Sequence, residues 1–398
     1  MRHLIALMLV VPFLMACEGT RVLPAPPADK AEIVQVPGFP GVRSWGDAPP
    51  EESQARLRAM RRLISERIRA GVELPNGGEV DVLLLSGGGS DGAYGAGLLA
   101  GWTDRGNRPE FWVVTGISTG ALIAPFVFAG PEFDAELERF YTNTKTEDLV
   151  TFRVFDALRG TFLGLTDATA LSKTVEEALT PELLKRIGEE HARGRRLLVG
   201  TTNLDAQRPV VWDVGRIAAT GKPGARQLIR DILLASAAIP GAMAPVQIAV
   251  EAGGQRFAEM HVDGGVTRQL FFLPPSLRLR AIRNLFGPDF RIGTIYLLRN
   301  TKLAPDYAET GAGIVPITSR SISTMIKFSG VANVRNIETQ ARQNGFKLKV
   351  TAVPESFSHP EEEMFDPKYM RALFQVGYDA IVDGDPWEVL IGPEAPNG

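Results

Sequence analysis

Two apolar runs that each end in a glycine-rich turn set the strongest constraint on the fold of this chain. Residues 80–85 read VDVLLL and are followed by SGGGSDG, whereas residues 111–115 read FWVVT and are followed by GISTG. Nearly continuous apolar runs are typical of strands that are buried on both faces, and such strands occur in parallel sheets with helices on both sides. Because similar runs alternate with helical patterns further along the chain, the sequence predicts an α/β fold. We expect three layers, α/β/α, around a mostly parallel central sheet.

The remaining elements follow from apolar runs and helical periodicity. Further strands are predicted at residues 196–202, 210–213, 246–250, 256–262, 294–298 and 347–353. Helices are predicted near residues 133–141, 168–179, 181–192, 226–237, 316–343 and 366–382.

The first 16 residues have the pattern of a signal peptide. Arg2 and His3 precede an apolar run too short to span a membrane stably, and small residues close it. The segment Leu14-Met15-Ala16-Cys17 resembles the bacterial lipoprotein processing box, in which the cysteine becomes the lipid-modified first residue. An ordinary secretory peptide with a chance cysteine is the alternative. Since Glu18 stands where lipoproteins of the inner membrane tend to carry Asp, we expect a lipid anchor in the outer membrane.

Two segments separate this peptide from the first predicted strand. Residues 17–50 are rich in Pro and Ala and predict a tether with little structure of its own. Residues 51–79 predict an amphipathic helix with several arginines, which either lies on an anionic membrane or covers the sheet. The net charge of −3 gives no argument for nucleic acid as a partner.

The turn after the first strand holds Gly87, Gly88 and Gly89. With Gly92 it satisfies G-x-G-x-x-G, a pattern of dinucleotide sites. Such sites also need an acidic residue at the end of the second strand, where this chain has Thr115. A tightly packed turn is one alternative. Another is a pocket of backbone N–H groups that would stabilise an oxyanion.

The second turn, Gly116-Ile117-Ser118-Thr119-Gly120, matches G-x-S-x-G between a strand and a helix. This context is typical of a nucleophile elbow, in which a sharp turn leaves the serine hydroxyl exposed at the sheet edge. We therefore predict that Ser118 is a nucleophile, with a structural helix cap as the alternative.

A nucleophilic serine needs a base. His191 lies in a charged helical segment and is expected to be solvent-exposed, and His359 lies in a polar loop. His261 shares a strand face with Asp263, which ends that strand before Gly264-Gly265. A buried carboxylate at position 263 would have a raised pKa and would serve as a base. An Asp-Gly turn without chemistry is the alternative.

Together, these motifs resemble the patatin-like phospholipases over about residues 80–275. The segment Ala235-Ser236-Ala237-Ala238-Ile239-Pro240 also resembles this family. The resemblance implies a patatin-like fold and a lipid acyl hydrolase with a Ser–Asp dyad, a lipid or phospholipid substrate, and no metal or other cofactor. Residues 276–398 would complete the domain as an α/β extension without an assigned role. The residues that match the family motifs are Ser118 as nucleophile, Asp263 as base, Gly87, Gly88 and Gly89 as the oxyanion hole, and Gly116 and Gly120 as elbow glycines.

One position departs from the family pattern. Asp91 stands where the family usually has Arg or Lys, and a carboxylate there would oppose a developing oxyanion. We predict that its side chain turns away and caps the helix that begins at Gly92. Two other functions stay open: an α/β-hydrolase with a triad of Ser118, Asp263 and His359, and a lipoprotein that binds lipid or a partner on an inactive scaffold.

Apolar residues beside the motifs are candidates for an acyl groove, with core packing as the alternative. These candidates are Phe152, Phe155, Phe162, Leu163, Phe271, Phe272 and Leu273.

Overall fold

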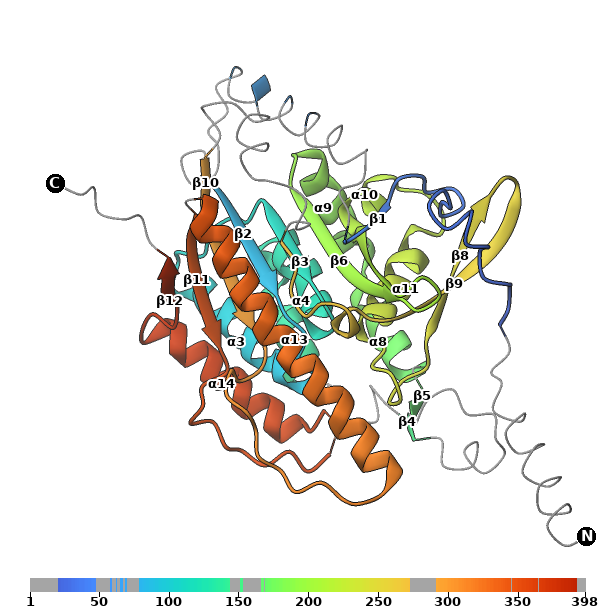
Figure 1. Ribbon diagram of the computed structural model, residues 1–398. Coiled ribbons are helices and arrows are strands. Elements are labelled where there is room, and N and C mark those ends of the chain that lie inside the picture. The colour runs from blue at the N-terminus through green and yellow to red at the C-terminus, as the bar shows by residue number, and fades with distance from the viewer. Residues whose placement is uncertain are drawn as a thin grey trace, which may run out of the picture.

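Figure 1 shows the fold of the chain as a computed structural model. The structure describes residues 21–47, 79–143, 151–152, 166–167, 169–272, 291–344, 346–363 and 365–391, together with Arg58, Arg62, Ser65, Glu66 and Arg69. The predicted signal peptide with Cys17, most of the predicted helix over 51–79, and residues 273–290 lie outside the described residues. The isolated residues described between 51 and 70 are helical.

A ten-stranded sheet forms the centre of the molecule. Its five central strands are parallel in the order β6-β3-β2-β10-β11, and antiparallel strands extend the sheet at both edges. The prediction of a mostly parallel sheet is therefore confirmed. The central strands are β6 (Arg196–Asn203), β3 (Val113–Gly116), β2 (Glu79–Leu85), β10 (Arg291–Arg299) and β11 (Lys347–Ala352). The antiparallel strands are β1 (Arg43–Trp45), β7 (Arg208–Asp213), β8 (Val246–Ala252), β9 (Gln255–Asp263) and β12 (Glu388–Ile391).

Helices cover both faces of this sheet, which confirms the three layers (Figure 1). The buried apolar side chains form two cores, one on each face of the sheet. Alternate residues of β2 contribute to different cores: Leu83 and Leu85 belong to the first, and Val82 and Leu84 belong to the second. The long helix α13 (Ile314–Asn344) packs on the second core, and the other helices pack on the first. These others are α3 (Gly92–Asp104), α4 (Thr119–Ala129), α5 (Asp134–Thr142), α8 (Thr169–Ala178), α9 (Pro181–Ala192), α10 (Val214–Ala219), α11 (Ala225–Ala237) and α14 (Pro367–Val382).

Local sequence signals explain where several elements begin. At the start of α9, the Thr180 side chain accepts the N–H of Leu183, and Pro181 occupies the first helical position. Asp366 caps α14 in the same way, with a proline next to it. Apart from the helix over residues 51–79, most of which lies outside the described residues, the strands and helices predicted by residue range all occur, with ends that differ by up to three residues. The short β1, β12 and α10 were not predicted, because they lack a periodic run long enough to recognise.

The predicted tether over residues 17–50 is wrong for its described part, residues 21–47. Val34, Val36, Phe39 and Val42 are buried in the main core, and β1 pairs with the edge strand β7. The proline content concealed these apolar residues, whose burial stabilises the segment on the domain by roughly 1.5–3 kcal/mol for each fully buried side chain.

Strand register places the carboxyl ends of β2, β3 and β10 side by side, at the edge of the sheet where the parallel strands end. Leu85 of β2 is paired with Gly116 of β3 on one side and with Leu298 of β10 on the other. The segments that follow these strands are therefore neighbours. Because β10 comes from the region after residue 275, that region contributes directly to this edge. Within the described residues, no helix is long and apolar enough to cross a membrane.

Candidate active site

Ser118 lies in a strained turn between β3 and α4. Its backbone has φ 55° and ψ −127°, which a residue with a side chain rarely adopts. Both flanking glycines are required by close backbone contacts. A Cβ on Gly116 would lie 2.3 Å from the carbonyl oxygen of Gly120, and a Cβ on Gly120 would lie 2.5 Å from that of Leu85. The turn therefore has the geometry of a nucleophile elbow.

A backbone hydrogen bond holds Ser118 in this turn, and its side chain faces Asp263. The backbone N–H donates to Oγ of Ser236 at 2.9 Å, and that hydroxyl donates to the carbonyl of Gly200 at 2.7 Å. The Ser118 side chain interacts with the carboxylate of Asp263 and lowers the pKa of that carboxyl. Sequence reasoning singled out the segment around Ser236 by resemblance but did not recognise this role.

Asp263 ends β9, which pairs antiparallel with β6. The carboxylate is buried and accepts the backbone N–H of Gly265 at 2.7 Å. Burial raises its pKa to about 6, and the Ser118 side chain and the hydrogen bond from Gly265 oppose that rise. A carboxylate with this pKa is a much better base than one at the usual value of 3.8 and is still mostly ionised at neutral pH.

The glycine loop lies against this pair. A Cβ on Gly87 would lie 3.0 Å from Cβ of Ser118, and Gly89 has a φ of +58° with open space beside it. In the described part of the chain, no residue accepts a hydrogen bond from the N–H groups of Gly87, Gly88 or Gly89. The loop therefore has free backbone donors next to the serine.

Asn300, directly after β10, fixes this loop. Its backbone N–H donates to Oγ of Ser86 at 2.9 Å, and its side-chain Nδ2 donates to the Ser86 carbonyl at 2.8 Å. A Cβ on Gly88 would lie 2.0 Å from the Asn300 carbonyl oxygen, so only glycine fits there. The Ser86 hydroxyl donates to the Gly87 carbonyl. Asn300 was not predicted from sequence, because a lone asparagine after a strand carries no local signal.

Gln269 lies between the glycine loop and the turn after Asp263. A Cβ on Gly87 would lie 2.6 Å from its Oε1, and a Cβ on Gly265 would lie 2.4 Å from its Nε2. The backbone N–H of Gln269 donates to Oδ1 of Asn333 in α13 at 2.8 Å. This residue was also missed by sequence reasoning.

The prediction that Asp91 caps α3 with its side chain is wrong. Asp91 occupies the cap position, but its carboxylate makes no cap bond and accepts a hydrogen bond from the Tyr369 hydroxyl of α14 instead. Burial raises the pKa of Asp91 to about 7, the Tyr369 bond lowers it, and the charges of Glu361 and Asp306 raise it further. A tyrosine from the last helix thus supplies the partner for this carboxylate.

His191 has different surroundings from those expected, whereas His261 lies in a strand and His359 in an exposed loop, as predicted. His191 was predicted to be exposed, but its side chain is only 16% exposed and Nδ1 lies 3.5 Å from Asp213, because α9 packs against α10. His261 is fully buried between Thr201 and Glu259, and burial lowers its pKa. His359 is exposed, and its ring lies near those of Phe357 and Tyr369.

An apolar pocket opens beside Ser118. Phe271 and Phe272, which were candidates for an acyl groove, do not line it, and Phe272 packs against Phe346 in the second core. The other groove candidates have side chains outside the described residues. The lining residues are Gly89, Ser118, Thr119, Leu122, Phe140, Tyr141, Leu171, Ala237, Ile239, Met243, Phe365 and Met370. Among the side chains that the structure describes, no group of three or more His, Cys, Asp or Glu residues is arranged to hold a metal ion.

The chain has matches among known protein families and solved structures. Residues 83–274 match the family model described as patatin-like phospholipase. No curated protein matches the chain. Among solved structures, the chain is similar to the crystal structure of VipD from Legionella pneumophila, with a TM-score of 0.39 and 13% sequence identity. That similarity covers 78% of this chain and 68% of the VipD chain.

Proposed function

We propose that this protein is a serine acyl hydrolase that cleaves acyl esters of lipids, because residues 83–274 match the patatin-like phospholipase family. Ser118 would be the nucleophile and Asp263 the general base. The observation that carries the proposal is the interaction of the Ser118 side chain with the buried Asp263 carboxylate, beside an apolar pocket. The pocket residues suit an acyl chain because they are mostly aliphatic or aromatic.

The proposed reaction has two halves. Oγ of Ser118 attacks the ester carbonyl carbon, its proton moves to Asp263, and the carbonyl oxygen becomes an oxyanion. The free N–H groups of Gly87, Gly88 and Gly89 would stabilise that charge. The intermediate then expels the alcohol, which takes the proton from Asp263, and an acyl-enzyme remains.

Water completes the cycle at the same pair. Asp263 accepts a proton from the water as its oxygen attacks the acyl-enzyme. Collapse of the second oxyanion releases the carboxylic acid, and Ser118 recovers its proton from Asp263. Each half moves one proton to Asp263 and back, which a carboxyl with a pKa of about 6 supports near neutral pH.

A fluorophosphonate probe tests the nucleophile. We expect labelling of the wild type and of Ser86→Ala, whose hydroxyl is held by Gly87 and Asn300, but not of Ser118→Ala. Mass-spectrometric analysis of products from mixed bacterial lipids, wild type against Ser118→Ala, identifies the ester that is cleaved. Labelling that persists in Ser118→Ala would refute the assignment.

The triad alternative has a direct test. His359→Ala retains full activity if Asp263 acts alone, and a large loss would favour a Ser-Asp-His triad. The exposed position of His359 and its absence from the pocket lining support the dyad.

A lipid-binding protein on an inactive scaffold is the second candidate function. The half-buried Asp91 carboxyl next to the glycine loop favours it, since a negative charge there opposes an oxyanion. Purified protein that binds lipid vesicles but cleaves neither short p-nitrophenyl esters nor vesicle phospholipid would establish this alternative.

We also propose that the protein is anchored in the outer membrane through lipid on Cys17. The basis is the sequence of residues 1–18 alone. Mass spectrometry of the mature N-terminus tests this, with Cys17→Ser expected to lose the acyl mass and to leave the membrane fraction.

A further inference from the structure

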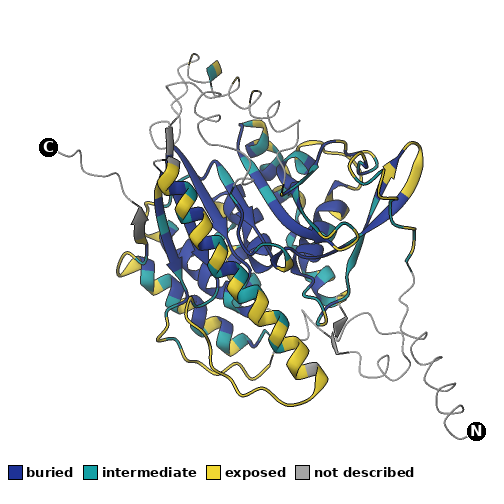
Figure 2. Cartoon of the chain, in the orientation of Figure 1, coloured by how far each residue is buried: buried dark blue, intermediate teal, exposed yellow. Residues whose placement is uncertain are grey.

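Helix α13 is longer than the sheet on which it packs. Its 31 residues span about 46 Å, whereas the nine residues of β10 and the six of β11 span about 30 Å and 20 Å. The side chains that α13 buries in the second core, Val334, Ile337 and Ala341, all lie in its C-terminal half. No described side chain between Ile314 and Ser329 is buried, as the yellow end of the helix shows (Figure 2).

The exposed half of α13 lies at the same edge of the sheet as Ser118. The chain leaves β10 at Asn300, which contacts Ser86 at the start of the glycine loop, and residues 301–313 lead from there to α13. The helix then runs back to β11 at the opposite edge (Figure 1). Its N-terminal half therefore extends beyond the edge that carries the candidate active site.

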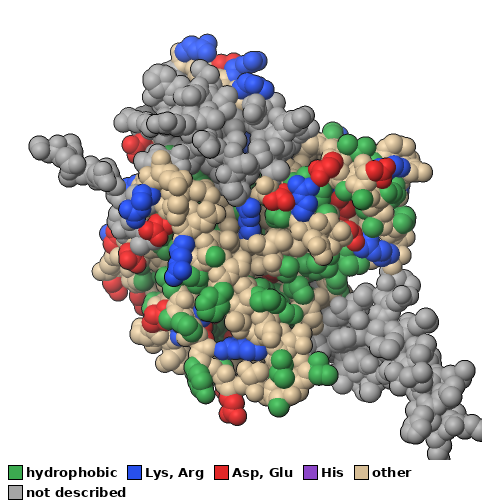
Figure 3. All heavy atoms as spheres, in the orientation of Figure 1, with side chains coloured by type: hydrophobic (Ala, Val, Ile, Leu, Met, Phe, Trp, Pro, Cys, Tyr) green, Lys and Arg blue, Asp and Glu red, His purple; other side chains and the backbone are tan. Residues whose placement is uncertain are grey.

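This half carries an exposed apolar stripe. Ile314, Ile317, Met325 and Phe328 recur at helical spacing and are 85%, 49%, 64% and 60% exposed. Tyr307, in the preceding loop, is 98% exposed. Hydrophobic side chains reach the surface at several separate places on the lower part of this face of the molecule (Figure 3). Ser321 and Thr324 lie between the two apolar pairs on this face of the helix. Several large apolar side chains exposed on one helix face indicate an interaction surface.

The charges of α13 favour an anionic partner. Residues 314–337 include the cations Arg320, Lys327 and Arg335 and no acidic residue, although the whole chain has a net charge of −3. Lys327 pairs with Asp306 in the loop at 2.6 Å. Among residues 301–337, four cationic side chains stand against two acidic ones.

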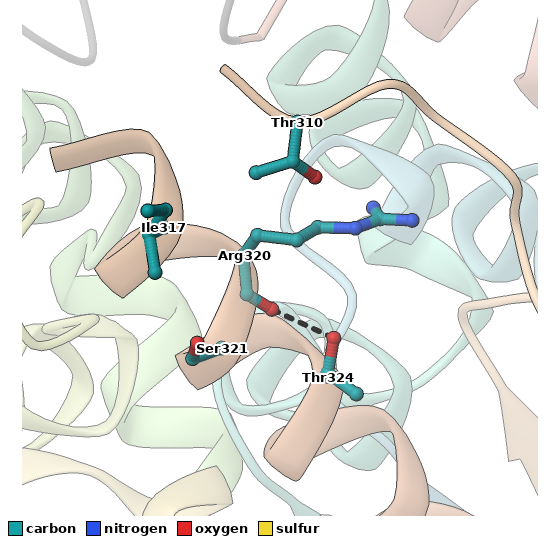
Figure 4. A pocket seen from close by; sticks show the side chains of 5 residues that line it. All are labelled: Thr310, Ile317, Arg320, Ser321 and Thr324. Atoms are coloured by element: carbon teal, nitrogen blue, oxygen red, sulfur yellow. Dashed lines mark hydrogen bonds between the residues drawn. The ribbon is translucent and has the colours of Figure 1, made fainter. Parts of the chain in front are cut away.

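A hollow beside the stripe places Arg320 among hydroxyl groups. It is lined by Thr310, Ile317, Arg320, Ser321 and Thr324, and the Arg320 side chain extends beneath Thr310 (Figure 4). The Arg320 guanidinium donates to the backbone carbonyl of Asp306 at this hollow. A guanidinium next to hydroxyl and apolar side chains suits the boundary between lipid headgroups and acyl chains.

We propose that the N-terminal half of α13, with the loop that carries Tyr307, docks on an anionic lipid bilayer. The apolar stripe enters the acyl boundary and Arg320 meets the headgroup phosphates. Docking turns the edge with Ser118 toward the lipid. The inference rests on the proposed function, because a lipid substrate supplies the surface.

A fluorescent reporter on α13 tests the docking directly. Met325→Cys and the matched control Gln343→Cys, which is exposed in the C-terminal half of the same helix, are each made in the Ser118→Ala chain. Each carries a polarity-sensitive fluorophore, and the unsubstituted Ser118→Ala chain serves as the labelling control. Vesicles contain phosphatidylglycerol or only phosphatidylcholine.

With phosphatidylglycerol vesicles, we expect emission from position 325 to shift to shorter wavelength and to be quenched by spin-labelled lipid. Emission from position 343 stays unchanged. An unchanged signal at 325 overturns the proposal, as does a shift without vesicles that grows with protein concentration, which would assign the surface to a second copy. Because Ser118 is absent, this result is independent of whether the wild type hydrolyses esters.

Activity provides a second readout. The double variant Met325→Glu, Phe328→Glu is expected to lower turnover of vesicle phospholipid on the order of tenfold, because burying these two side chains in lipid stabilises docking. Turnover of a soluble short-chain ester stays unchanged, and Gln343→Glu affects neither. Equal vesicle turnover in the double variant and the wild type would overturn the proposal.

Discussion

Replacing Asp263 with asparagine is expected to abolish activity and to stabilise the fold at neutral and alkaline pH. Asparagine keeps an oxygen to accept the Gly265 N–H but cannot take the proton of Ser118. The stabilisation arises because the carboxyl is buried, so that its ionised form is unfavourable in the folded protein.

The magnitude follows from the two pKa values of this carboxyl. Asp263 ionises near 3.8 in the unfolded chain and near about 6 in the folded protein. The folded state holds the proton more tightly, so its contribution to stability is present below about pH 4 and is lost as pH rises through about 6. A difference of about two pKa units corresponds to about 3 kcal/mol, of which about 2 kcal/mol falls between about pH 4.5 and about pH 8.

Urea unfolding of the wild type and Asp263→Asn across this pH range measures the effect. With increasing pH, the difference in free energy of unfolding between the two proteins should grow by about 2 kcal/mol in favour of the variant. The titration of Asp91 does not contribute to this difference, because both proteins contain Asp91. In parallel, kcat/KM of the wild type should rise with pH through an inflection near 6. A difference that stays constant with pH, or a variant that retains turnover, would refute the reasoning.

Three further substitutions test the surroundings of the site. Gly88→Ala should lower kcat on a soluble ester by about 100-fold or more, because its Cβ would collide with the Asn300 carbonyl and displace the oxyanion donors; an unchanged kcat would exclude this role. Ser236→Ala should lower the free energy of unfolding in urea by about 1–3 kcal/mol, since the elbow N–H loses its buried acceptor, and equal stability would contradict that account. Asp91→Asn should change turnover by less than about tenfold, because Tyr369 holds the carboxyl, whereas a rise of several hundredfold would indicate that its charge opposes the oxyanion.

The sheet and the elbow could be predicted because both depend on short stretches of sequence. Apolar runs such as residues 80–85 belong to strands buried on both faces, and the helical spacing after residue 366 belongs to α14. Gly116 and Gly120 follow from sterics, because a turn this sharp leaves no room for a Cβ. Local geometry thus explains why the element order and the position of Ser118 were readable from sequence.

The supporting residues could not be predicted, because their roles come from contacts between distant parts of the chain. Asn300 meets Ser86 across 214 positions, and Tyr369 meets Asp91 across 278. Neither contact leaves a periodic pattern in either segment. The buried apolar residues between 34 and 42 were missed for a related reason, since the core that receives them is assembled from distant strands and helices.

The sequence by itself therefore determined the alternation of strands and helices, the two glycine turns and the position of Ser118 in the second of them, because backbone sterics and hydrophobic periodicity act over a few residues. Only the tertiary structure brought Asp263 to Ser118, raised its pKa by burial, and gave Asp91 a tyrosine partner instead of a helix cap. Packing decides these features, because desolvation and side-chain hydrogen bonds depend on which distant segments meet in space.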